Sequence, residues 1–229
     1  MKRINSGIKG MDKMMEGGFP EGTVNLLKGP AGSAKTLFGL QFIQGGIENG
    51  EKCLFLSLEE SRENVRRAVE SFSLDWTPYE SGQAYLIDYG EIRRGDFEDS
   101  LISFTEIQTF LDNFMEGENI QRLVIDSISA VSLFYTSPEK LRRSLFEFSR
   151  FLKEKDLISL LISESENKRL NVEGFVADSF INMGYEDFEG EFRRSIKITK
   201  MRFTRHDPYK HPFLILNGGI EISVEEVLR

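Results

Sequence analysis

A glycine-rich segment, GPAGSAKT at residues 29–36, constrains the fold of this chain more than any other feature. It follows an apolar run, VNLL at 24–27, and it precedes 36–50, where apolar residues recur at mostly helical spacing. The order strand, glycine-rich loop, helix is typical of a phosphate-binding loop, whose usual pattern is G-x-x-x-x-G-K-[ST]. Ala34 stands where that pattern has its second glycine.

A phosphate-binding loop needs backbone N–H groups around the phosphate oxygens, a lysine near the β- and γ-phosphates, and a hydroxyl for Mg²⁺. Lys35 supplies the cation, Thr36 supplies the hydroxyl, and the start of the following helix adds its N-terminal dipole. The segment therefore predicts a nucleotide site with Mg²⁺. The residues expected to surround the nucleotide are Gly29, Pro30, Ala31, Gly32, Ser33, Ala34, Lys35, Thr36 and Leu37.

Ala34 raises a question of backbone geometry. Alanine is the best helix former, so it is harmless or slightly stabilising if this position has helical angles. If the position needs a positive φ, the methyl group costs on the order of 1 kcal/mol or more. The residues alone leave both alternatives open. We predict that Ala34 lies in the helical region and that the loop binds nucleotide.

Strands and helices alternate along most of the chain. Apolar strands are predicted at 53–60, 83–90, 122–129 and 156–164, and helices at 61–72, 99–117 and 137–155. Ser61 and Ser137 are expected to cap two of these helices, with Pro138 at a first helical position. After residue 164 the period becomes two, as in antiparallel strands, at 178–185, 191–203 and 211–222. The pattern predicts an α/β fold, a mostly parallel sheet with helices on both faces, and no linker divides residues 1–229.

The composition argues against several classes of protein. The formal net charge of this 229-residue chain is −8, whereas a dedicated duplex-DNA binder usually carries a basic face. No long uncharged apolar run is present, and MKRINSGIKG at 1–10 lacks the apolar core of a signal peptide, so we expect no membrane span. The single Cys53 lies in an apolar run and is expected to be a buried residue of a cytoplasmic protein.

Acidic residues follow two of the predicted strands. Asp126 ends the apolar run of LVIDS, and Glu59 and Glu60 end that of LSLEES. Because the carboxyl ends of parallel strands meet at one edge of a sheet, these residues should converge with the loop. We expect Asp126 to take a Mg²⁺-bound water beside Thr36 and so to belong to the metal site.

The two glutamates are candidate catalytic residues, since a carboxylate near the γ-phosphate can position or deprotonate a water molecule. Two adjacent acids are not expected to face the site together, and we favour Glu59 over Glu60. Other interpretations stay open. An aspartate after a strand also starts turns, and glutamates beside Ser61 also stabilise the start of a helix.

Taken together, five segments make this chain resemble the RecA-like ATPases. They are the entry segment SGIKGMDKMMEGGFPEGT, the loop GPAGSAKT, the strand-end segments LSLEES and LVIDS, and the late segment KMRFTRH. It is similar in particular to the single-domain archaeal and bacterial relatives of the clock protein KaiC. The resemblance covers nearly the whole chain. It implies a RecA-type core, ATP with Mg²⁺, and a hexameric ring of identical chains with nucleotide between subunits.

The resemblance also assigns roles to the late strand. Lys200 and Arg202 match the family lysine and arginine that reach the neighbouring subunit's γ-phosphate, and cations there can stabilise developing phosphate charge. His206 matches the family histidine, which is expected to help shape the subunit interface. Without the family pattern, an exposed strand with solvated charges is the simpler interpretation. Four residues separate His206 from His211, so we do not expect them to form a metal pair.

One departure concerns phosphorylation. The Ser-Thr pair that the clock protein phosphorylates would fall near Gly174 and Phe175, where no hydroxyl stands, so we do not expect clock-type autophosphorylation. The sequence favours a ring-forming, slowly hydrolysing ATPase that acts in signalling or regulation with a protein partner. The alternative is a non-hydrolysing nucleotide-dependent scaffold, for which the archaellum accessory ATPases give a precedent. A DNA recombinase relative is disfavoured by the acidic charge, and no nucleic acid partner is expected.

Overall fold

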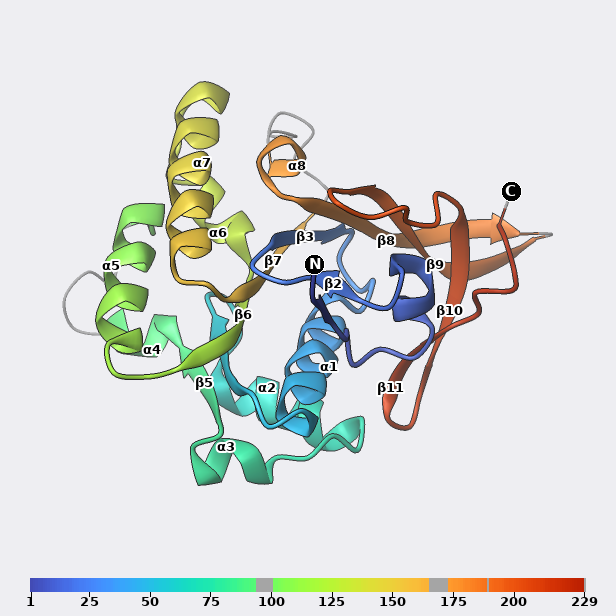
Figure 1. Cartoon of the computed structure of the whole chain (residues 1–229), viewed down its shortest axis with the longest axis horizontal. Helices are drawn as coiled ribbons and strands as arrows, with labels where there is room; N and C mark the ends of the chain where they lie inside the picture. Colours follow the sequence, from blue (N-terminus) through green and yellow to red (C-terminus); the bar gives the residue numbers. More distant parts are fainter. Residues whose placement is uncertain (94–100, 165–172, 189, 229) are drawn as a thin grey trace.

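The computed structural model describes residues 1–93, 101–164, 173–188 and 190–228, and in them nine strands form one sheet (Figure 1). In spatial order these strands are β11 (Gly219–Ile222), β10 (Lys210–Leu216), β9 (Glu191–Met201), β8 (Ser179–Phe188), β3 (Val24–Gly29), β7 (Ile158–Glu164), β6 (Ile120–Asp126), β4 (Lys52–Ser57) and β5 (Ala84–Asp88). The six from β8 to β5 run parallel to one another. The predicted mostly parallel sheet with terminal antiparallel strands is confirmed.

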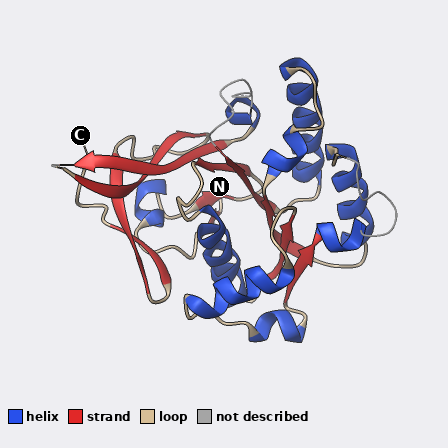
Figure 2. Cartoon of the chain, turned by 180° about the vertical axis from the view of Figure 1, so that it is seen from behind, coloured by secondary structure: helices blue, strands red, loops and turns tan. Residues whose placement is uncertain are grey.

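Helices cover both faces of this sheet, as Figures 1 and 2 show from opposite sides. The first face packs against η1 (Met11–Met15), α1 (Lys35–Glu48), α2 (Arg62–Ser71) and α3 (Thr77–Ser81). The second packs against α4 (Tyr89–Arg93), α5 (Phe104–Met115), α6 (Ile128–Ser132) and α7 (Pro138–Glu154). The short α8 (Glu173–Val176) lies against α7, and β1 (Arg3–Ile4) pairs separately with β2 (Phe19–Pro20). No helix in the described ranges is long and apolar enough to cross a membrane.

The central strands read as continuous apolar runs because both of their faces are buried. In β3, Val24 and Leu26 pack into the core under α7, whereas Leu27 packs into the core under α1. In the same way, Leu123 and Val124 of β6 enter opposite cores. Side chains of successive strand residues point to opposite faces, so a strand between two helical layers favours apolar residues on both faces.

Local signals set the helix ends. The hydroxyls of Ser61 and Ser137 accept hydrogen bonds from backbone N–H groups at the starts of α2 and α7, as expected for caps. The helix predicted at 99–117 begins later, at Phe104, because Ser103 and Glu106 form a capping box there. Residues 94–100, which include the first two positions of that prediction, lie outside the described part of the chain.

The strand predicted at 178–185 differs from the expectation in one respect. It was expected to be antiparallel, and β8 does pair antiparallel with β9, but it also pairs parallel with β3. Its sequence alternates as in an antiparallel strand because β8 lies where the parallel part of the sheet meets the antiparallel part. The segment predicted as one strand at 211–222 is instead two strands, β10 and β11, because the chain turns after Leu216. As predicted, the pairing in this part of the sheet is antiparallel, between β9 and β10 and between β10 and β11.

Candidate nucleotide-binding site

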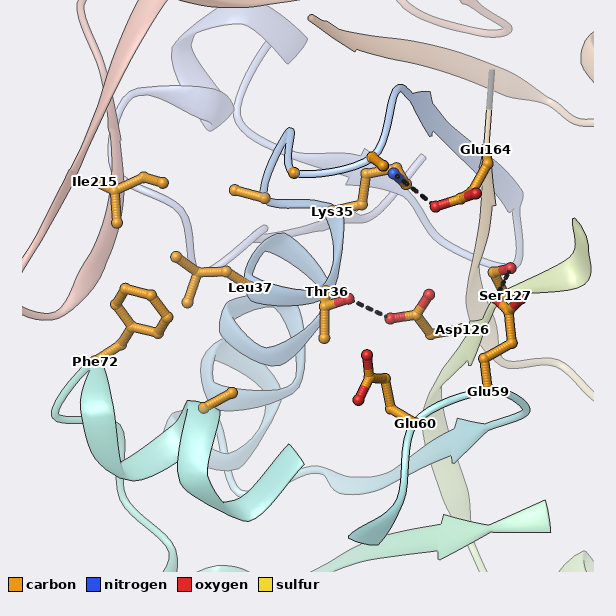
Figure 3. A pocket seen from close by; sticks show the side chains of 14 residues that line it. Lys35, Thr36, Leu37, Glu59, Glu60, Phe72, Asp126, Ser127, Glu164 and Ile215 are labelled. Carbon is orange, nitrogen blue, oxygen red and sulfur yellow. Dashed lines mark hydrogen bonds and ion pairs between the residues drawn. The ribbon is translucent and has the colours of Figure 1, made fainter. Parts of the chain in front are cut away.

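The loop between β3 and α1 opens onto a cavity of about 570 Å³ at the carboxyl edge of the parallel strands (Figure 3). The cavity is lined by Ala31, Gly32, Ala34, Lys35, Thr36, Leu37, Glu59, Glu60, Ala68, Phe72, Asp126, Ser127, Glu164 and Ile215. The polar residues come from the ends of β3, β4, β6 and β7. The expected convergence of the loop with Asp126, Glu59 and Glu60 is therefore present in the structure.

Lys35 and Thr36 begin α1 and both face the cavity. The Lys35 ammonium donates a hydrogen bond to the carbonyl oxygen of Pro30 at 2.8 Å and lies 3.8 Å from a carboxylate oxygen of Glu164. The Thr36 hydroxyl donates to Oδ2 of Asp126 at 2.7 Å. A cation, a hydroxyl and a carboxylate thus stand together at the N-terminus of a 14-residue helix, where anions are stabilised.

Asp126 is nearly fully buried at the end of β6. Burial, with the charge of Glu59 as a smaller contribution, raises the pKa of its carboxyl to about 6, against the lowering effect of the Thr36 hydrogen bond. A nearby divalent cation would offset the burial cost of the charged form. The oxygen donors of Asp126 and Thr36 are also the type that Mg²⁺ prefers, so these residues fit the ion that the fold implies.

Both glutamates line the cavity, which corrects the expectation that only one would face it. Glu59 accepts a hydrogen bond from the Ser127 hydroxyl, and Glu60 accepts one from the side-chain amide of Asn64 at 3.1 Å. The expectation was wrong because β4 ends at Ser57, so the acids lie in a bend where the alternation of a strand does not apply.

Ala34 has a φ of 71°, so the prediction of helical backbone angles is wrong. It is the N-cap of α1, and its carbonyl accepts the first helical hydrogen bond from the N–H of Phe38 at 3.0 Å. The helix begins at Lys35, as expected, and the loop turns through a left-handed conformation at the residue before it. Glycine adopts that conformation freely, whereas alanine is strained there by about 1–2 kcal/mol.

Several residues around the cavity were not predicted. Glu164 ends β7, and the strand-end argument used for Asp126 would have identified it. Tyr185 of β8 donates a hydrogen bond from its hydroxyl to the carbonyl oxygen of Gly32 at 2.6 Å, and so supports the loop. Phe72 and Ile215 come from the end of α2 and from β10, and no sequence pattern places them beside the loop.

Lys200 and Arg202 do not line this cavity. The Lys200 ammonium donates to the carbonyl oxygens of Gly174 at 3.1 Å and Ala177 at 2.6 Å, and burial followed by the charge of Arg202 lowers its pKa. The Arg202 guanidinium donates to Asp178 at 3.2 Å.

His206 is also absent from the cavity lining, and its Nδ1 is buried without a hydrogen-bond partner in the described ranges. The structure therefore brings together the loop and the strand-end acids, and it places the late-strand residues elsewhere.

Comparison with known proteins identifies the family. A family model described as "ATPase: KaiC" matches residues 4–227. A UPF0273 protein of Thermotoga maritima is 30% identical over 239 residues, covering 99% of this chain and 98% of the relative. The circadian clock protein KaiC3 of Synechocystis is 28% identical over 95% of this chain, which corresponds to 44% of that protein.

A solved structure of a KaiC-like protein from Pyrococcus horikoshii superposes with a TM-score of 0.82 at 34% identity, covering 96% of this chain and 98% of the other. The fold, the loop at the carboxyl edge of the sheet and the matched family model agree. The chain belongs to the KaiC-like ATPase family.

Proposed function

We propose that this protein binds ATP with Mg²⁺ and hydrolyses it slowly. The observation that carries the proposal is the hydrogen bond from Thr36 to the buried Asp126, made beside Lys35 at the start of α1. This is the arrangement of hydroxyl, carboxylate and lysine that a phosphate-binding loop requires. Membership of an ATPase family supports the same assignment.

The loop N–H groups and Lys35 would hold the β- and γ-phosphates, while Thr36 and Asp126 would hold Mg²⁺. The ion would supply positive charge that neutralises the phosphate oxygens. Glu59 would orient or deprotonate the attacking water, and Glu60 lies close enough in the cavity to share that role. Hydrolysis would be slow in a single chain because Lys200 and Arg202, the cations proposed to stabilise charge on the γ-phosphate, do not line the cavity of their own chain.

The proposed assembly is a ring, a hexamer by the resemblance to KaiC, with nucleotide between subunits. Lys200 and Arg202 would act on the neighbouring subunit's γ-phosphate, and His206 would help to shape the interface. Both cations now contact groups of their own chain, so they would exchange these contacts for the neighbour's phosphate. We propose a cytoplasmic role in signalling or regulation, through a protein partner that responds to the nucleotide state.

Phosphate release from ATP by the wild type, Lys35→Ala and Glu59→Gln tests the enzymatic part. We expect slow release by the wild type and at least about tenfold less by each variant. Equal release by all three proteins would contradict the assigned site.

A scaffold that binds ATP without hydrolysing it is the second candidate. The same-chain contacts of Lys200 and Arg202 favour it, because cations held in this way do not reach a neighbour's phosphate. Light scattering with and without ATP separates the two functions. A scaffold would assemble with ATP and with a non-hydrolysable analogue alike, while releasing no phosphate.

A further inference from the structure

Asp178 is a buried carboxylate that two cations of its own chain share. It lies between α8 and β8, where α8 packs against α7 (Figure 1), and its side chain is only 4% exposed. Its Oδ1 accepts hydrogen bonds from the Lys153 ammonium at 2.8 Å and from the Arg202 guanidinium at 3.2 Å. Its Oδ2 accepts one from the N–H of Val24 at 3.1 Å. A buried carboxylate is costly unless it is paired, so at least one of the two cations has to stay.

The two cations are held in different ways. Lys153 belongs to the last turn of α7, where the helix dipole also favours a positive charge, and its contact with Asp178 is the shorter one. Arg202 follows β9, and its side chain is 48% exposed. The N–H of Arg202 donates to the carbonyl oxygen of Asp178 at 2.9 Å, so the backbone stays in place if the guanidinium moves away. Arg202 is therefore the partner that can leave, and Lys153 is the one that can stay.

Positive charges surround the Arg202 guanidinium. It lines a cavity of about 260 Å³ to which the described residues contribute four cations and no acid; the lining consists of Arg142, Phe146, Ser149, Arg150, Lys153, Phe175, Val176 and Arg202. Since like charges repel, the carboxylate of Asp178 offsets the repulsion at this position. A phosphate carried by a neighbouring chain would compete with that carboxylate for the guanidinium, because arginine binds both anions in the same planar, two-pronged way.

We propose that Asp178 and Lys153 set the position of Arg202. Asp178 holds the guanidinium on its own chain until a neighbouring chain presents a nucleotide, and Lys153 keeps the buried carboxylate paired after the guanidinium has left. The inference rests on the proposed function, because it takes Arg202 to act on the neighbour's γ-phosphate. Asp178 and Lys153 do not touch the nucleotide, so both are positioning residues.

Light scattering against protein concentration, with Mg²⁺ and a non-hydrolysable ATP analogue, tests this inference. Asp178→Asn keeps an acceptor for the N–H of Val24 and frees Arg202, so it should lower the concentration at half-assembly by about threefold or more. Lys153→Gln leaves Arg202 to pair the carboxylate, so it should raise that concentration by at least about threefold. Lys153→Arg keeps the charge and should stay within about twofold of the wild type. Lys140→Gln is the matched control, since it removes the same charge from an exposed position of α7.

Two combined variants separate positioning from a structural role. Asp178→Asn leaves no carboxylate to pair, so adding Lys153→Gln to it should change the concentration at half-assembly by less than about twofold. Arg202→Ala leaves no guanidinium to free, so Asp178→Asn should have no effect in that background. This second combination decides the outcome if Lys153→Gln does not fold.

The inference would be overturned if Asp178→Asn or a folded Lys153→Gln left the concentration at half-assembly unchanged. Shifts of equal size in the combined variants would also overturn it, since they would show that the side chains act on stability alone. Failure of the wild type to assemble with the analogue would overturn it as well. The expected shifts without phosphate release from ATP would support the inference and contradict only the proposed hydrolysis.

Discussion

Lys35 and Arg202 lie at opposite edges of the central sheet. Lys35 follows the carboxyl end of β3. Arg202 lies near the start of β3, because its N–H donates to the carbonyl oxygen of Asp178, and the N–H of Asp178 donates to the carbonyl oxygen of Val24. The six residues of β3 span roughly 20 Å at about 3.3 Å per residue, which the two side chains together do not bridge. If both act on one phosphate, they come from different chains.

The strain at Ala34 leads to a prediction about stability. Ala34→Gly should leave the free energy of unfolding unchanged or raise it by up to about 1 kcal/mol, because glycine tolerates a positive φ. Ala130→Gly, inside α6, should instead lower it by about 1 kcal/mol. Urea denaturation measures both values. An Ala34→Gly variant destabilised as much as the control would show that the left-handed conformation is not strained.

The raised pKa of Asp126 predicts a pH dependence of stability in buffer free of metal and nucleotide. The folded state holds this proton more tightly than the unfolded state, so the stabilisation is complete below pH 4 and is lost as the pH rises through about 6. Asp126→Asn lacks this loss and should be more stable than the wild type at pH 8, by up to about 3 kcal/mol. Denaturation at pH 4.5, 6 and 8 provides the comparison. A difference between the two proteins that does not change with pH would contradict it.

Glu59 and Glu60 both line the cavity, and their variants should differ in effect. Glu59→Gln should lower the rate of ATP hydrolysis by about 100-fold or more, since it removes the proposed base. Its ATP affinity should stay within about threefold of the wild type, because the lost group acts on water and not on the phosphates. Glu60→Gln should reduce the rate by less than about tenfold. Steady-state phosphate release and calorimetry separate the two effects, and a reversed order would assign the base to Glu60.

The sequence predicted the parts of the site that depend on strand ends. The loop, Asp126 and the two glutamates follow apolar runs, and parallel strands bring such positions to one edge. The conformation of Ala34 was predicted wrongly, because the closure of the loop onto α1 sets its angles and the helix propensity of alanine does not. The position of Glu60 in the cavity was also predicted wrongly, because Glu60 lies in a bend after β4, where strand alternation does not set the direction of side chains.

The side of the cavity that is lined by Phe72 and Ile215 could not be predicted for a different reason. Phe72 and Ile215 are far apart in the sequence, and they meet because the turn between β10 and β11 bonds to the end of α2. Such a contact depends on how the antiparallel strands fold back over α1. No periodicity or motif in either segment encodes it.

The central claim is that nucleotide lies between two chains, and the activity of mixed rings tests it most directly. Lys35→Ala and Arg202→Ala should each release little phosphate alone. When the two are mixed before ATP is added, about one quarter of the interfaces would combine an intact loop with an intact Arg202, if chains assemble at random. We predict recovery of about a quarter of wild-type phosphate release, and none when Lys35→Ala is mixed with the double variant. A mixture no more active than the sum of its separate components would contradict the claim.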